Sequence, residues 1–99
     1  MSYANRRTYI ICAASSGTES GNMLIDRVCG TEDQVKQYLF ELLKEDRATD
    51  ADHWESGVER IEDAEVDLYT GRIVMWANYG DYHIDYNAIP QMEPTDLGD

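Results

Sequence analysis

Hydrophobic and polar positions change their spacing along the chain, and each change marks a predicted element. The run from Tyr9 to Ala14 is apolar and rich in strand-forming residues, and Met23 to Cys29 is a second such run. The polar, glycine-containing stretch 15–22 between them has the composition of a hairpin loop. We therefore expect a β-hairpin at the start of the fold.

The clearest helix signal follows this hairpin directly. Thr31 is suited to cap the helix N-terminus, and Gln34 has the spacing that completes a capping box. Apolar residues then recur at helical spacing and form one stripe, made of Val35, Tyr38, Leu39, Leu42 and Leu43. We expect this amphipathic helix to lie on the sheet.

Residues 48–63 give a mixed signal. Trp54, Val58 and Ile61 have the spacing of one helical face. Gly57 lies between them, and glycine weakens a helix by about 1 kcal/mol relative to alanine. We predict a loop that contains a short helix.

Strand-like alternation returns after residue 64. Val66 and Leu68 alternate with acidic residues, and turn-forming residues separate this run from the apolar runs 73–79 and 82–89. This pattern predicts a three-stranded meander, followed by a polar and flexible tail over residues 91–99. The predicted order is ββαβββ, in a single α+β domain over residues 1–90. We expect one antiparallel sheet with one long helix on one face, with or without a short second helix.

The net charge of the chain is more informative about its function than its length is. Twenty acidic residues oppose eight basic ones in 99 residues, giving a net charge of −12, whereas a magnitude of about 2–8 already keeps a small domain soluble. Such a charge disfavours direct binding of nucleic acid or anionic lipid and favours a basic protein surface as partner. Acidity that serves only solubility is the alternative. With no signal-peptide pattern and no apolar run near about 20 residues, we expect a cytoplasmic protein without membrane contact.

The negative charge is concentrated between residues 41 and 67, which we call the acidic segment. Its eleven carboxylates are opposed only by Lys44, Arg47 and Arg60, which leaves a net charge of −8. We predict that these carboxylates bind the partner; they are Glu41, Glu45, Asp46, Asp50, Asp52, Glu55, Glu59, Glu62, Asp63, Glu65 and Asp67.

The spacing of the carboxylates suggests what they imitate. Residues four apart on a helix, such as Glu41 and Glu45 or Glu55 and Glu59, lie roughly 6 Å apart at their stems. Successive phosphates of a nucleic-acid strand are separated by a similar interval. A surface of this kind can therefore enter a Lys/Arg groove built for a nucleic-acid backbone.

Aromatic residues offer candidate apolar anchors beside this charge. Tyr79, Tyr82 and Tyr86 place amphipathic rings around the last two predicted strands. Tyrosine is enriched at binding hot spots, but the same rings are suited to a core or its rim. Both interpretations stay open at this point.

No complete catalytic or metal-binding constellation is visible. His83 and Asp85 project from the same side of a strand, but two ligands do not make a metal site. The spacing of Cys12, Cys29 and His53 does not unite a nucleophile, a base and an orienting group. In the predicted hairpin the two cysteines lie about four residues out of register, roughly 13 Å at ~3.3 Å per residue, too far to bridge. We predict no enzyme activity, no cofactor, no metal, and two buried, reduced thiols.

In size, charge and acidic segment, the chain resembles the small acidic proteins of bacterial prophages and mobile elements, particularly the anti-CRISPR and antirestriction inhibitors. Segments 29–39 (CGTEDQVKQYL) and 81–90 (DYHIDYNAIP) are also similar to uncharacterised proteins of that setting. The resemblance implies a non-enzymatic inhibitor that blocks DNA, PAM or guide-RNA binding by a nuclease effector, and it assigns no residue by motif. The alternative is a small accessory domain that pairs through its sheet, with a second copy as a homodimer or with another protein.

Overall fold

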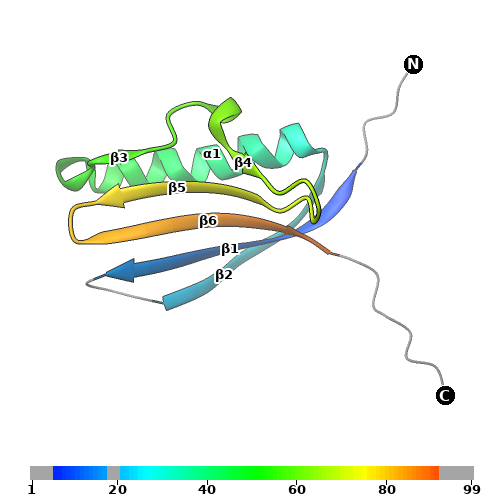
Figure 1. The fold of residues 1–99 in the computed structure, drawn as a ribbon, viewed down its shortest axis with the longest axis horizontal. Helices are drawn as coiled ribbons and strands as arrows, with labels where there is room; N and C mark the ends of the chain where they lie inside the picture. Colours follow the sequence, from blue (N-terminus) through cyan, green and yellow to red (C-terminus); the bar gives the residue numbers. More distant parts are fainter. Residues whose placement is uncertain (1–5, 18–20, 92–99) are drawn as a thin grey trace.

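A six-stranded antiparallel sheet and one long helix build the fold (Figure 1). This computed structural model describes residues 6–17 and 21–91. The helix α1 (Glu32–Thr49) follows the second strand, and the strands are β1 (Arg7–Gly17), β2 (Gly21–Gly30), β3 (Ser56–Gly57), β4 (Glu65–Val66), β5 (Ile73–Tyr79) and β6 (Tyr82–Pro90). The predicted α+β class, with one long helix on an antiparallel sheet, is confirmed.

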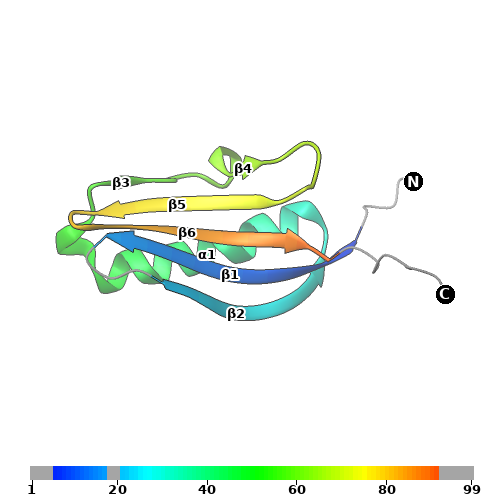
Figure 2. The same cartoon turned by 60° about the horizontal axis from the view of Figure 1, so that its bottom comes forward.

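The last strand joins the two halves of the sheet. The strand order is β2-β1-β6-β5-β3, and β4 pairs with the same strand, β5, that β3 does. Strand β6 therefore inserts between the N-terminal hairpin and β5, pairing with both of them (Figure 2). The sheet has β2 at one edge and the short strands β3 and β4 along the other.

The N-terminal hairpin forms as predicted, with an irregularity in its register. Thr8 lies opposite Cys29 as expected, but Cys12 lies opposite Leu24 because the register shifts between Ile11 and Cys12. Both cysteines are free. The prediction that both thiols are buried is wrong: Cys12 is only partly buried, and Cys29 is exposed because it lies on an edge strand and faces away from α1.

Helix α1 begins where its capping box predicts. The Gln34 backbone N–H donates to Thr31 Oγ1 at 3.2 Å, and the Thr31 backbone N–H donates to Gln34 Oε1 at 2.9 Å. Both bonds satisfy donors that a helix N-terminus leaves without intrahelical partners. The predicted stripe faces the sheet, with Val35, Leu39 and Leu43 fully buried.

The core lies between α1 and one face of the sheet. Buried positions alternate along β5, as expected for a strand that is covered on one side. The buried hydrophobic residues of the sheet are Tyr9, Ile11, Ala13, Ile73, Met75, Ala77, Tyr79, Tyr86 and Ala88. Full burial of such side chains stabilises a fold by about 1.5–3 kcal/mol for each large aliphatic or aromatic residue.

The segment after α1 differs from its prediction. Two 3₁₀ turns, η1 (Ala51–His53) and η2 (Ile61–Asp63), flank β3, and no helix carries Trp54, Val58 and Ile61 on one face. Backbone N–H groups bond to β5 instead: Glu55 donates to the Asn78 carbonyl at 2.9 Å and Val58 to the Trp76 carbonyl at 3.0 Å. The neighbouring strand supplies hydrogen bonds that a helix would otherwise make internally.

The predicted meander is confirmed in β4, β5 and β6, although β4 has only two residues. Leu68, which the alternation placed on a strand, lies in the turn after β4. Gly71 and Gly80 provide positive φ angles of 80° and 59° at the two connections. Strand β6 ends at Pro90, and the predicted tail lies almost entirely outside the described residues.

Gly57 allows the segment to lie against β5, so Gly57→Ala should destabilise the fold. An added Cβ would lie 2.5 Å from the Trp54 ring and 2.8 Å from the Trp76 carbonyl oxygen. We expect a loss of about 1–3 kcal/mol in the free energy of unfolding, measured by urea titration. Gly21→Ala is the control, because its Cβ would meet no atom within 4 Å. Equal midpoints for the two variants would contradict the close packing at Gly57.

Candidate interaction surfaces

The acidic segment occupies the helix side of the molecule and the β3–β4 edge. It begins on the second half of α1, continues through η1 and β3, and returns through η2 and β4 along the outer edge of β5 (Figure 1). Nine of its eleven carboxylates are exposed, namely Glu41, Glu45, Asp52, Glu55, Glu59, Glu62, Asp63, Glu65 and Asp67. One continuous stretch of chain thus displays negative charge along one side of the sheet.

The basic residues of the segment are each paired within it. Lys44 lies 3.5 Å from Glu41, and Arg60 lies 3.1 Å from Asp63. Arg47 lies 3.9 Å from Glu59, and its guanidinium also sits 4.1 Å from the Trp54 ring centroid. Exposed ion pairs of this kind contribute little to stability, because solvent and salt screen them. They leave the net charge of the segment unchanged, because all three cations were already counted in it.

Two carboxylates of the segment, one half-buried and one exposed, also make contacts that hold the local structure. The His53 ring donates through Nδ1 to Asp50 Oδ1 at 2.6 Å, and this hydrogen bond raises the pKa of His53. Asp67 Oδ1 accepts from the backbone N–H groups of Tyr69 at 2.8 Å and Thr70 at 3.2 Å. These carboxylates are therefore partly committed to the fold.

The predicted spacing of one helical turn between carboxylates holds for only part of the acidic segment. Glu41 and Glu45 do lie one turn apart on α1. Glu55 and Glu59 are not helical neighbours, because β3 and the extended chain after it separate them. Their expected spacing of one helical turn is therefore wrong.

The candidate tyrosine anchors belong largely to the core. Tyr79 is 1% exposed and Tyr86 is 7% exposed, while Tyr82 is half-buried and stacks on Tyr79 with ring centroids 5.2 Å apart. Burial favours the core interpretation for Tyr79 and Tyr86, so neither side chain is available as a surface anchor.

Asp46 lies against these buried rings and differs from the other carboxylates of the segment. Its Oδ2 atom and the Tyr79 hydroxyl are both buried, and neither completes a hydrogen bond of ordinary geometry with another described residue. Burial and then the nearby Asp46 carboxylate raise the pKa of Tyr79 well above its usual value, and the same causes raise that of Tyr86. Both phenols therefore stay neutral in the folded protein over the ordinary pH range.

A rigid turn presents two apolar side chains that the sequence did not single out. Leu68 is 94% exposed and Tyr69 is 100% exposed. The turn itself is held by the two bonds to Asp67 Oδ1, by the Gly71 N–H bond to the Asp67 carbonyl at 2.8 Å, and by the Asp67 N–H bond to the Arg72 carbonyl at 2.9 Å. Large apolar groups held rigidly in water are typical of interface anchors.

The sheet face opposite α1, which we call the open face, has a mixed and ordered composition. Figure 2 views it with α1 behind the strands, and no described element covers it. Directly paired residues of antiparallel strands share a face, so its side chains form rows across the sheet. The first row holds Arg27, Ile10 and Ile89; the second holds Leu24, Cys12, Asn87, Val74 and Glu65; the third holds Asn22, Ala14, Asp85 and Trp76. Arg72 directly precedes β5 and reaches onto this face, where its Nε donates to Asn87 Oδ1 at 3.0 Å.

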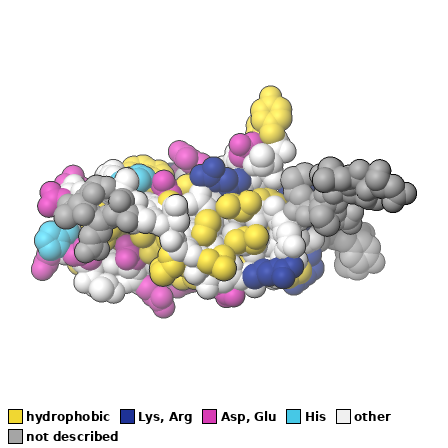
Figure 3. All heavy atoms as spheres, turned by 90° about the horizontal axis from the view of Figure 1, so that it is seen from below, with side chains coloured by type: hydrophobic (Ala, Val, Ile, Leu, Met, Phe, Trp, Pro, Cys, Tyr) yellow, Lys and Arg dark blue, Asp and Glu magenta, His cyan; other side chains and the backbone are white. Residues whose placement is uncertain are grey.

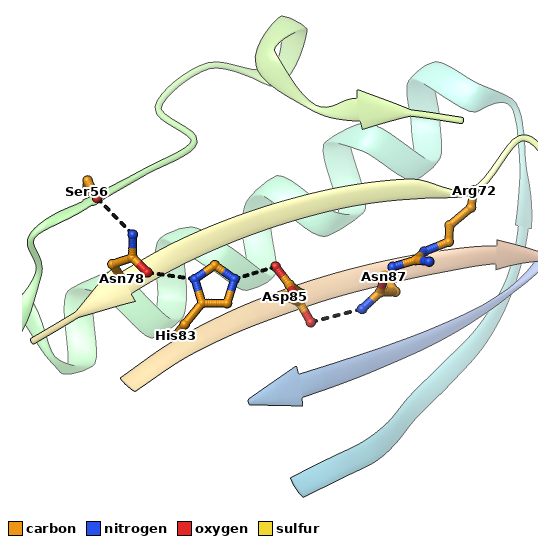
Figure 4. Close-up of polar contacts among 6 residues, drawn as sticks. All are labelled: Ser56, Arg72, Asn78, His83, Asp85 and Asn87. Atoms are coloured by element: carbon orange, nitrogen blue, oxygen red, sulfur yellow. Dashed lines mark hydrogen bonds and ion pairs between the residues drawn. The ribbon is translucent and has the colours of Figure 1, made fainter. Parts of the chain in front are cut away.

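A chain of polar contacts runs along the open face over β5 and β6, from Ser56 to Arg72 (Figure 4). His83 lies between Asn78 Oδ1, at 2.6 Å from Nδ1, and Asp85 Oδ1, at 2.8 Å from Nε2. Asn78 donates to the Ser56 hydroxyl at 3.1 Å, and the Trp76 ring stacks near His83 at 6.1 Å. Both ring nitrogens of His83 therefore lie against side-chain oxygen atoms of its neighbours. Within the described ranges, no group of three or more His, Cys, Asp and Glu side chains is placed to hold a metal ion.

Comparison with known proteins gives no relative: no family model, curated protein or solved structure matches the chain. Over the described part of the chain, no helix has both the length and the apolar character needed to cross a membrane. The charge, exposure and geometry of the surfaces above are therefore the basis for a functional proposal.

The buried phenols predict how stability changes in alkali. Above pH about 10 the unfolded chain releases tyrosine protons that Tyr79 and Tyr86 retain when folded. The unfolded state then binds fewer protons, so the free energy of unfolding falls as pH rises. Tyr79→Phe should make this fall shallower in urea titrations between neutral pH and about pH 12. Tyr69→Phe, at a fully exposed ring, is the control, and an equal effect of both variants would contradict the assignment.

Proposed function

We propose that this chain is a non-enzymatic inhibitor whose acidic segment occupies the basic, nucleic-acid-binding surface of a partner protein, such as a defence nuclease. The observation that supports this most is the separation of charge in the fold. On the open face Arg27 and Arg72 balance Glu65 and Asp85, so this face has no net charge. The excess negative charge of the described residues therefore lies on the helix side and at the sheet ends and edges.

The way the carboxylates are held supports competition with nucleic acid. Glu41 and Glu45 are fixed on α1, and the Glu55 backbone is hydrogen-bonded to β5. Charges on a rigid framework lose little conformational entropy on binding, so more of their attraction to Lys and Arg contributes to affinity. The surrounding field accelerates encounter with a basic groove, and the same field repels phosphates from the protein itself.

The Leu68–Tyr69 turn adds an apolar anchor to this proposal. It directly follows β4 at the edge where the acidic segment ends. Charge complementarity alone mainly sets the rate of association and the orientation, whereas buried aromatic and aliphatic groups set much of the lifetime of a complex. The partner surface that fits is an apolar pocket bordered by Lys and Arg side chains.

Neutralising Glu55 and Glu62 should weaken binding to the partner. Both side chains are exposed, and neither forms an ion pair with a described residue. We expect the double variant Glu55→Gln, Glu62→Gln to lose at least about tenfold in affinity, mostly through slower association. Biolayer interferometry against a purified guide-loaded RNA-guided nuclease and a purified type I restriction enzyme, over a salt series, measures this.

The matched control is Met23→Lys with Gln91→Lys. This variant changes the net charge by the same amount, but its sites lie outside the acidic segment and are exposed. It should bind almost as the unmodified chain does. Equal losses in both double variants would show that only total charge matters, and binding that does not weaken as salt rises would contradict charge mimicry.

Removing the apolar anchor should shorten the lifetime of the complex. Leu68→Ser with Tyr69→Ser should raise the dissociation rate by about tenfold, equivalent to about 1.4 kcal/mol. The free energy of unfolding should stay almost unchanged, because both side chains are exposed and the turn is held by backbone groups and Asp67. An unchanged dissociation rate would remove this turn from the interface.

A further inference from the structure

The open face carries an apolar centre that is unusual for so acidic a chain. Figure 3 shows hydrophobic side chains gathered in the middle of this side, with Lys or Arg side chains beside them and carboxylates mostly toward the periphery. Leu24 is 71% exposed and Ile89 is 41% exposed, and Ile10, Val74 and Trp76 are half-buried. Exposed apolar groups that adjoin one another in this way are typical of interaction sites.

Charges on the open face are ordered along the strands. Arg27 stands in the first row and Arg72 directly precedes β5 at the same end of the face, whereas the carboxylates of Glu65 and Asp85 occupy the second and third rows. The face is therefore neutral as a whole, positive at one end and negative further along. A surface with this arrangement is complementary to itself when two copies meet with their strands antiparallel.

We propose that the open face is a self-association surface, through which two copies of this chain form a face-to-face dimer with two-fold symmetry. The symmetry axis lies between the two sheets, perpendicular to the strands, and passes over the second row. The first row of each copy then lies over the third row of the other copy. Arg72 of each copy contacts Asp85 and Trp76 of the other, so the same contact forms twice. Such isologous pairing is the commonest form of closed oligomer.

The composition of the second row is suited to a position on the symmetry axis, where each side chain meets its own copy. Leu24, Cys12 and Val74 form most of it, so that apolar side chains meet their own copies there. Asn87, which is 4% exposed, lies among them, and its amide group already bonds to Arg72 and to the Asp85 carbonyl. Glu65 lies at the exposed rim of the row, where a long side chain can turn into solvent.

Electrostatics also selects a second copy as the occupant. Each chain carries a net charge of −12, so contact through the helix side or the β3–β4 edge would bring like charges together. Contact through the open face limits this repulsion to Glu65 at the rim and keeps the rest of both acidic segments accessible to the outside. Self-association therefore does not compete with the proposed binding of a basic partner.

A charge-exchange experiment tests this dimer directly. Sedimentation equilibrium of the full chain at micromolar concentration should give twice the chain mass. Arg72→Glu alone and Asp85→Arg alone should each give the single-chain mass, because each places like charges together twice. An equimolar mixture of the two variants should return to the dimer mass, since both contacts are then between opposite charges, and so should the double variant Arg72→Glu, Asp85→Arg.

Three controls make the result decisive. Lys44→Glu and Glu45→Arg, at exposed positions on α1, carry the same charge changes and should remain dimeric. Leu24→Lys, at an exposed position of the second row, should be monomeric even if the other variants are poorly folded by circular dichroism. A monomeric unmodified chain, a dimer that persists in Leu24→Lys, or folded Arg72→Glu and Asp85→Arg variants whose mixture stays monomeric would each overturn the proposal. Binding of an unrelated protein to this face by a monomeric chain would count against it in the same way.

Discussion

The packing of α1 against a single face of the sheet determines the rest of this structure. Leu39 and Leu43 are buried against β-strand residues such as Ile11 and Met75, and this contact removes the largest continuous apolar surface from water. Among the described residues no second element packs on the other face, so one face of the sheet is covered by α1 and the other stays exposed. The core, the exposed carboxylates of α1 and the open face are all consequences of that one contact.

Sequence predicts most reliably where neighbours in the chain decide the structure. Thr31 and Gln34 start a helix through bonds to each other, and the two tight connections of the meander depend on a few turn residues. The pairing of β6 with β1, by contrast, joins residues far apart in the chain, and no local pattern specifies it. Residues 48–63 show the same limit, because their backbone bonds go to β5 and Gly57 is required by close approach to Trp54 rather than by flexibility.

The candidate surfaces were predictable only in their composition. The sequence shows the density of carboxylates, but it does not show that Asp46 faces buried tyrosines or that Asp67 holds a turn. Tyr79 and Tyr86 could be assigned to the core only when the face covered by α1 was known. Conversely, in the sequence Leu68 looks like a strand end and Tyr69 like an ordinary turn residue, because their exposure depends on side-chain and backbone bonds around Asp67.

High net charge and self-association are usually opposed, since repulsion between like charges weakens any dimer. In this fold the geometry reconciles them, because most carboxylates of the acidic segment lie away from the neutral face of the sheet. A face-to-face dimer would place two sheets, about 10 Å apart, between the two helices and would direct both acidic segments outward. A partner with two basic sites could then be engaged twice, and the second contact would gain from the high effective concentration that the first creates. The apolar open face would in that case strengthen the function of the acidic side without touching the partner.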